Sequence, residues 1–156
     1  MVHSYGQTRA ATKKAKCEDC GKEVTWTAWY GDNNALPTAS GHYYLADDML
    51  GKATTIAASA TVVLDLNGHT IKTDGASRLI SMNNGKNTFV LMDTSEGKTG
   101  TIVAAHGVGA VNGAFVWANK GSFKMYGGIK HIHYESINFA PGILTMHDNS
   151  VKIIKL

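Results

Sequence analysis

Two cysteines are the residues of this chain best suited to metal or redox chemistry. Cys17 and Cys20 form a single Cys-x-x-Cys-Gly motif. A structural zinc ion takes four ligands, and the chain has no second Cys-x-x-Cys motif. A histidine such as His3 or His42 could complete a metal site, although the spacing matches no known zinc finger. We interpret the pair as free thiols or a small local disulfide, with a metal site and a redox pair as the alternatives.

A second candidate for metal binding is a pair of histidines near the C-terminus. His131 and His133 are two residues apart, so they lie on the same face of an expected strand. Two imidazoles can bind a transition metal if a third ligand such as His147 joins them. The alternative is that both histidines face solvent and bind nothing.

A cluster of aromatic residues is the candidate for ligand binding. Within about twenty residues the chain places Trp26, Trp29, Tyr30, Tyr43 and Tyr44. Aromatic rings stack on sugar rings, but they also bury large apolar areas in a protein core. If residues 24–29 form one strand, Trp26 and Trp29 point to opposite faces, so that one is in the core and the other is free. Glycan contact and packing of a cap are the two interpretations.

The elements that carry these residues are expected to be short strands. Gly is abundant at 17 residues and Pro is scarce at 2, while charged residues make up only 17% of the chain. Strand-forming residues alternate with Asn-Gly and Asp-Gly turns, and no stretch of ten residues has a helical period. With 156 residues, the chain is long enough for one domain with a real core. We therefore predict an all-β fold.

A repeated pattern indicates how the strands are arranged. Residues 62–66 alternate, with Val62, Leu64 and Leu66 on one face. Equivalent strands occur later in the chain, and the aligned positions Leu64, Leu91, Met125 and Met146 are 27, 34 and 21 residues apart. A coil of a three-sided solenoid takes roughly 20–30 residues, and the longest interval contains a plausible insertion. The pattern favours about four parallel, stacked coils over an antiparallel sandwich.

Composition divides the chain into three parts. Residues 1–22 are expected to be a flexible basic lead-in that contains the Cys-x-x-Cys motif. Residues 23–52 are expected to form an N-terminal aromatic cap, and residues 53–156 the coils. The net charge of +3 is modest, and no apolar run approaches the about 20 residues of a membrane span. We expect no nucleic-acid partner and no membrane insertion, and we see no signal peptide.

Several motifs together resemble a known family. These are the Cys-x-x-Cys-Gly motif and the segments 24–29, 36–38, 41–45, 64–71 and 123–128. In order and spacing they resemble the right-handed parallel β-helix repeats of large surface proteins from anaerobic gut Firmicutes, within the pectate-lyase-like superfamily. The resemblance covers residues 17 to 130. It implies a right-handed parallel β-helix in an extracellular or cell-surface setting, and it implies no established activity.

The resemblance also raises the question of lyase chemistry. Pectate-lyase-like enzymes hold Ca²⁺ with carboxylates beside a basic residue. The candidates here are Asp65, Asp93 and Asp148, with Arg78 or a nearby Lys as the base. Calcium takes six to eight oxygen ligands, which one carboxylate per coil does not supply. Asp65 and Asp93 could also approach the spacing of a glycosidase pair, but they are not equivalent relative to Leu64 and Leu91. We interpret each Asp as a cap on a turn.

These observations lead to a functional expectation. We expect a non-catalytic extracellular module that acts as a rigid stalk or an adhesion surface toward a glycan or a host-surface protein. We assign no catalytic residue and no cofactor, because the chain has no nucleophile elbow, P-loop or dinucleotide motif. The alternatives are a fragment of a polysaccharide lyase and a subunit that forms homo-oligomers by stacking open coil ends.

Overall fold

The computed structural model describes residues 11–73, 79–83, 86–103, 116–118 and 120–126, together with four short strands nearer the C-terminus. Within these residues the secondary structure is β-strand, with one 3-10 turn at Asp32–Asn34 and no α-helix. The prediction of an all-β fold is confirmed. None of these segments forms a helix that could cross a membrane.

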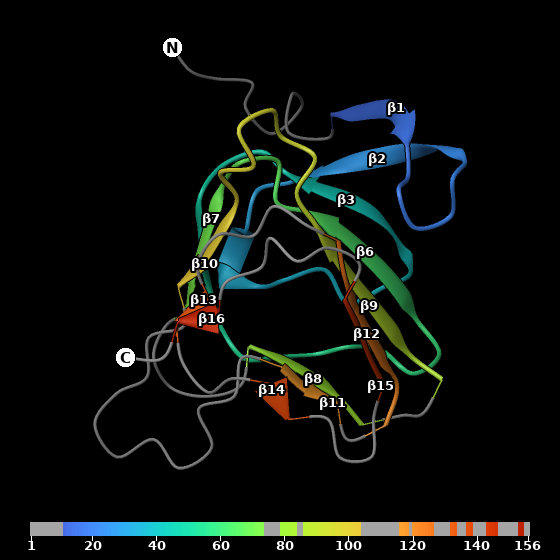
Figure 1. Ribbon diagram of the computed structural model, residues 1–156, viewed down its shortest axis with the longest axis vertical. Coiled ribbons are helices and arrows are strands. Elements are labelled where there is room, and N and C mark those ends of the chain that lie inside the picture. Colours follow the sequence, from blue (N-terminus) through green and yellow to red (C-terminus); the bar gives the residue numbers. More distant parts are fainter. Residues whose placement is uncertain are drawn as a thin grey trace.

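The strands form three sheets (Figure 1). The seven-stranded sheet has the order β1 (Thr12–Lys16), β2 (Glu23–Trp29), β3 (Gly41–Leu45), β6 (Thr61–Asp65), β9 (Thr88–Met92), β12 (Ser122–Met125), β15 (Ile143–Met146). The five-stranded sheet has the order β16 (Ile153–Ile154), β13 (Ile132–His133), β10 (Thr101–Val103), β7 (Thr70–Thr73), β4 (Met49–Gly51). The four-stranded sheet has the order β14 (Ile137–Asn138), β11 (Val116–Ala118), β8 (Ile80–Met82), β5 (Thr54–Thr55).

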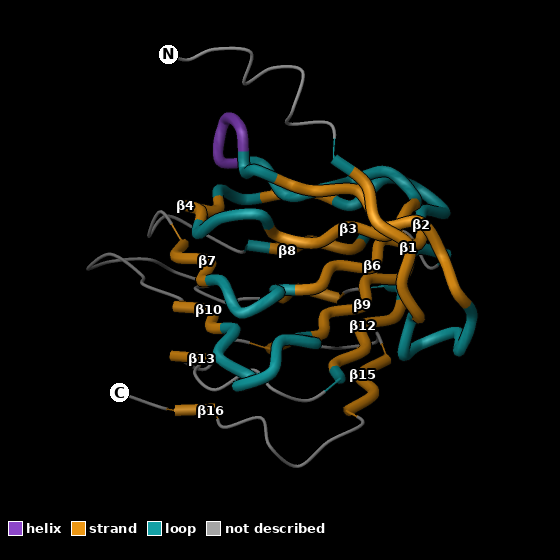
Figure 2. Tube along the Cα trace, turned by 90° about the horizontal axis from the view of Figure 1, so that it is seen from above, coloured by secondary structure: helices purple, strands orange, loops and turns teal. Residues whose placement is uncertain are grey.

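Pairing is parallel throughout these sheets except between β1 and β2, which form an antiparallel hairpin. The largest sheet is therefore mixed. From β3 onward, successive strands along the chain belong to the seven-stranded, the five-stranded and the four-stranded sheet in turn. Figure 2 shows the resulting rows of strands, in which β7, β10, β13 and β16 succeed one another down one side.

The register of the seven-stranded sheet matches the alignment made from the sequence. Leu64 pairs with Leu91, Leu91 with Met125, and Met125 with Met146. In-register parallel pairing places like side chains above one another. Phe89 and Phe123 illustrate this, because their rings stack with centroids 6.0 Å apart and planes 12° apart.

An inner core lies between the three sheets. Val62, Leu64 and Leu66 all belong to it, as their alternation predicts, and Leu64 and Leu66 are fully buried. The turn after β6 uses Asn67 and Gly68, whose positive φ angles of 51° and 82° suit these two residue types. Local sequence therefore places the inner face of β6 and the corner after it.

A second apolar cluster covers the opposite face of the seven-stranded sheet. We call it the outer cluster, and its buried members are Cys17, Trp26, Val63, Val90 and Met92. Strands of this sheet are thus buried on both faces, which explains why Phe89–Met92 is a continuous apolar run rather than an alternating one. The N-terminal hairpin supplies the covering side chains Cys17 and Trp26.

The described part of the expected lead-in, residues 11–22, is not a flexible tail, and residues 1–10 lie outside the described residues. Residues 12–16 form strand β1, whose five residues pair with β2, and Cys17 has no exposed surface. The physical reason is that Val63 and Val90 would expose apolar area on the outer face without the hairpin. The predicted cap is also continuous with the later strands, because β3 pairs in parallel with β6.

Candidate metal centre

A tight turn brings the two cysteines together. Cys17 and Cys20 flank the turn between β1 and β2. The Gly21 amide donates to the Cys17 carbonyl at 2.8 Å, and the Cys17 amide donates to the Lys22 carbonyl at 2.8 Å. Gly21 has φ +72° and no atom near its missing Cβ, so its backbone conformation rather than space favours glycine. The chain therefore reverses over six residues and returns Cys20 to Cys17.

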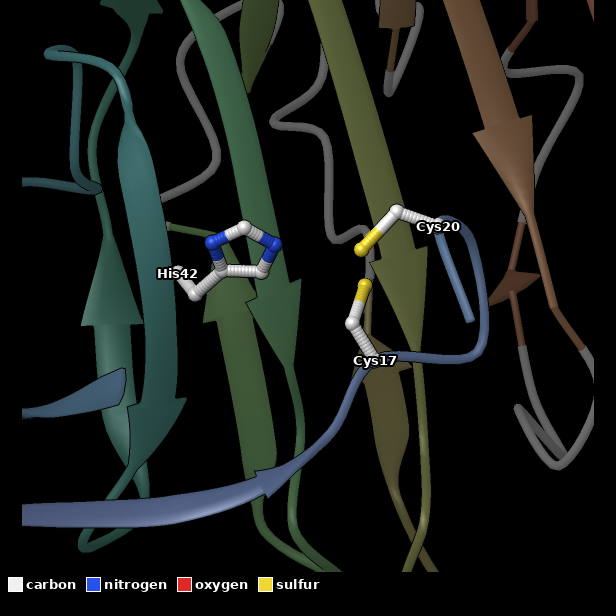
Figure 3. A group of neighbouring side chains, drawn as sticks. All are labelled: Cys17, Cys20 and His42. Carbon is white, nitrogen blue, oxygen red and sulfur yellow. The ribbon is translucent and has the colours of Figure 1, made fainter. Parts of the chain in front are cut away.

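His42 reaches the same place from strand β3. It pairs with Val63 of β6, which belongs to the outer cluster, so its ring lies on the face that the hairpin covers. The ring meets Trp26 edge-to-face, with centroids 5.1 Å apart and planes 76° apart. The two sulfur atoms and an imidazole nitrogen of His42 all lie within 4.8 Å of one another (Figure 3).

Exposure differs among the three side chains. Cys17 is buried, His42 is half-buried and Cys20 is exposed. Burial raises the pKa of the Cys17 thiol above its ordinary value. Burial also lowers the pKa of His42, and the negative charge of Asp19 opposes that shift. The lowered pKa favours the neutral imidazole, in which one ring nitrogen can act as a ligand or hydrogen-bond acceptor.

Polar contacts hold the turn against the sheet. Asp19 accepts a hydrogen bond from the Tyr126 hydroxyl at 2.6 Å and forms an ion pair with Lys124 at 3.1 Å. Both partners are more than 100 residues away along the chain. In addition, the Trp26 indole donates to the Ala15 carbonyl at 3.1 Å. The position of the cysteines is thus fixed from both sides of the turn.

The histidines near the C-terminus were the other metal candidates from the sequence. His131 and His147 lie outside the described residues, and for His133 the structure describes only the backbone of β13. Cys17 and Cys20 are brought together as their spacing suggests. His42 was one of two histidines considered. It lies beside them on β3, which pairs with β2 of the hairpin on one side and with β6 on the other, and His3 lies outside the described residues.

The aromatic candidates are packed to different degrees. Trp26 and Trp29 lie on opposite faces of β2, as predicted, but neither ring is free. Trp26 is 2% exposed in the outer cluster, and Trp29 packs against the inner core and meets Tyr43 edge-to-face at 5.4 Å. Tyr44 packs against the outer cluster, and Tyr30 is half-buried. Their role in glycan contact stays a prediction.

The two described carboxylates that were considered for lyase chemistry form hydrogen bonds within turns. Asp65 accepts the Asn67 amide at 2.8 Å, the Thr94 amide at 3.0 Å and the Thr94 hydroxyl. Asp93 accepts three backbone amides, those of Gly68 at 3.0 Å, Ser95 at 3.1 Å and Gly100. The interpretation of these residues as turn caps is confirmed. Asp148 and Arg78 lie outside the described residues.

Comparison with models of protein families, with curated protein sequences and with solved structures finds no match to this chain.

Proposed function

We propose that this chain is a right-handed parallel β-helical module, and that it is a rigid, non-catalytic stalk or binding element of an extracellular bacterial surface protein. The observation that supports this best is the order of the strands. From β3 to β16 the chain enters three sheets in a repeated sequence, and β6, β9, β12 and β15 each add to the preceding strand in parallel. Such a stack is stiff, because every added strand extends three hydrogen-bonded ladders.

The absence of catalysis in this proposal rests on how the buried carboxylates are bonded. Asp65 and Asp93 are 3% and 0% exposed, and their oxygens accept hydrogen bonds from turn amides and a hydroxyl. A general acid or a calcium ligand needs a carboxylate that faces a substrate or an ion. These two carboxylates instead fix the corners that join one strand row to the next.

A binding surface for an acidic glycan is the best-supported form of the proposal. A cavity of about 530 Å³ lies beside β1, and its polar and aromatic lining is Lys13, Lys16, Glu18, Trp26, Asp65, Thr94. The Lys13 ammonium lies 4.2 Å from the centroid of the Tyr44 ring. The exposed ammonium groups of Lys13 and Lys16 suit the carboxylates of an acidic glycan.

A glycan array with the full chain tests this function. We expect binding to oligosaccharides that contain uronic acids, and we expect binding to weaken in the Lys13→Ala/Lys16→Ala double variant. Lys52→Ala is the matched control, because Lys52 is exposed and does not line the cavity. If the double variant binds as tightly as the parent chain, the ligand binds elsewhere on the surface.

The same preparation separates the alternatives. An ultraviolet-absorbing unsaturated product released from polyuronate would contradict the non-catalytic proposal and favour a lyase. Large species that grow with concentration in light scattering would favour assembly by stacking. In that alternative, another copy of the chain pairs with the edge strands β14, β15 and β16. Each of these is the last strand of its sheet in the described part of the chain.

A further inference from the structure

We propose that Cys17, Cys20 and His42 form a binding site for a thiophilic divalent cation, with Zn²⁺ as the best fit, that fastens the N-terminal hairpin to the seven-stranded sheet. This inference does not depend on the proposed glycan binding. It rests on three ligand atoms from two separate elements that converge on one point of the outer face.

The distances suit a tetrahedral ion after a small adjustment. Zn–S bonds of about 2.3 Å and Zn–N bonds of about 2.0 Å place neighbouring tetrahedral ligand atoms roughly 3.5–3.8 Å apart. The three ligand atoms here already lie within 4.8 Å of one another. A closure of about 1 Å is a side-chain rotation, and Cys20 is exposed and therefore able to make it.

The ligand types select the class of metal. Two thiolates and an imidazole are soft or borderline ligands, which favour zinc over calcium or magnesium. Among the described residues no further Cys, His, Asp or Glu joins the group. Asp19, in the same turn, already contacts Tyr126 and Lys124. The site is thus a Cys₂His set, whose fourth position is filled by water or by a ligand from outside these residues.

His42 distinguishes a metal site from a disulfide. A Cys17–Cys20 disulfide would need no third residue, and His42 would then be one more ring packed on Trp26. A metal site instead links the hairpin turn to β3, with 21 residues of chain between Cys20 and His42. Metal binding therefore stabilises the contact between the two elements as well as the turn.

Titration of the reduced, metal-free full chain with Co²⁺ and Zn²⁺ tests the proposal. We expect one Co²⁺ per chain, with a thiolate-to-cobalt charge-transfer band and the strong visible bands of a tetrahedral ion, both displaced by Zn²⁺. At a free Zn²⁺ concentration one hundred times the Kd, linkage predicts a rise in Tm of about 5–10 °C.

Two variants identify the ligands, and neither replaces a fully buried side chain. Cys20→Ser removes the exposed thiol, and His42→Ala removes the imidazole. Loss of a residue that only hydrogen-bonds to a metal ligand weakens metal binding by about 10–100-fold. Loss of a ligand itself, as in each of these variants, should weaken binding by more than that. His69→Ala is the matched control, because His69 pairs with Asp48 away from the site and should leave binding unchanged. Circular dichroism of each metal-free variant checks that it is folded.

Three outcomes would overturn the proposal. The first is an absence of metal uptake by the reduced, folded chain at micromolar concentration. The second is bound cobalt without a thiolate band. The third is binding that Cys20→Ser or His42→Ala leaves as tight as in the parent chain. If the first outcome is accompanied by a stoichiometric Cys17–Cys20 disulfide in the isolated protein, the pair is a local structural disulfide instead.

Discussion

Replacing the buried carboxylate of Asp93 with an amide should destabilise the fold by about 3 kcal/mol. Asp93 has no exposed surface, and its two oxygens accept the amides of Gly68, Ser95 and Gly100. In Asp93→Asn one oxygen becomes an NH₂ group, so at least one backbone amide loses its acceptor. An unsatisfied buried donor costs about 1–3 kcal/mol, and hydrogen bonds that lose a charged acceptor weaken by about 1 kcal/mol each.

Urea unfolding at pH 7, followed by tryptophan fluorescence, measures this change. With a slope m of about 1–3 kcal/mol per molar urea, the midpoint should fall by about 1 M or more at unchanged m. Asp47→Asn is the control, because Asp47 is exposed and its carboxylate accepts only the neighbouring Asp48 amide among the described contacts. Its stability should stay within about 0.5 kcal/mol of the parent.

The reasoning would be refuted by an Asp93→Asn variant that unfolds at the parent midpoint with the parent slope. The three amide contacts would then contribute nothing measurable to stability. The carboxylate would again be available for another role, and the argument that Asp93 is not catalytic would lose its support.

Three further changes test other parts of the structure. Phe89→Ala removes a ring that stacks on Phe123 and is fully buried, so urea unfolding should show a loss of about 3–5 kcal/mol. Trp26→Phe removes an indole that donates a hydrogen bond in the outer cluster, and the expected loss is about 0.5–1.5 kcal/mol. Burial, together with the hydrogen bond to Asp19 as the smaller cause, raises the pKa of Tyr126 above its ordinary value of 10.0. The Tyr126 hydroxyl therefore loses its proton at a lower pH in the unfolded chain than in the folded one, so the free energy of unfolding should fall as pH rises above 10. The fall should be smaller in Tyr126→Phe, and an equal pH dependence in the two proteins would contradict this account.

Much of the fold could be predicted because its information is local. Alternation in residues 62–66 assigns Val62, Leu64 and Leu66 to one face, and these residues do lie in the inner core. The alignment of Leu64 with Leu91 and Met125 predicted the correct register, because a side-chain period of two allows no shift by one residue without exposing the core. The turn roles of Asp65 and Asp93 could also be predicted from their positions at strand ends.

The covering of the outer face could not be predicted in the same way. Composition assigned residues 1–22 to a flexible lead-in, since basic residues dominate there. Local pattern does not reveal that Val63 and Val90 need a partner, or that Cys17 and Trp26 supply it. That partnership depends on the hairpin folding back over strands that come much later in the chain.

The sequence by itself determined the strands of the repeated pattern, such as residues 62–66, which of their side chains face inward, and where the chain turns after them, but it did not reveal strand β1. These properties result from the period of apolar residues and from the backbone preferences of Asn, Asp and Gly. Only the tertiary structure decided what covers the outer face and which histidine meets Cys17 and Cys20. His42 lies beside them because β3 pairs in parallel both with β2 of the hairpin and with β6. Proximity across separate strands is a property of pairing that no local pattern encodes.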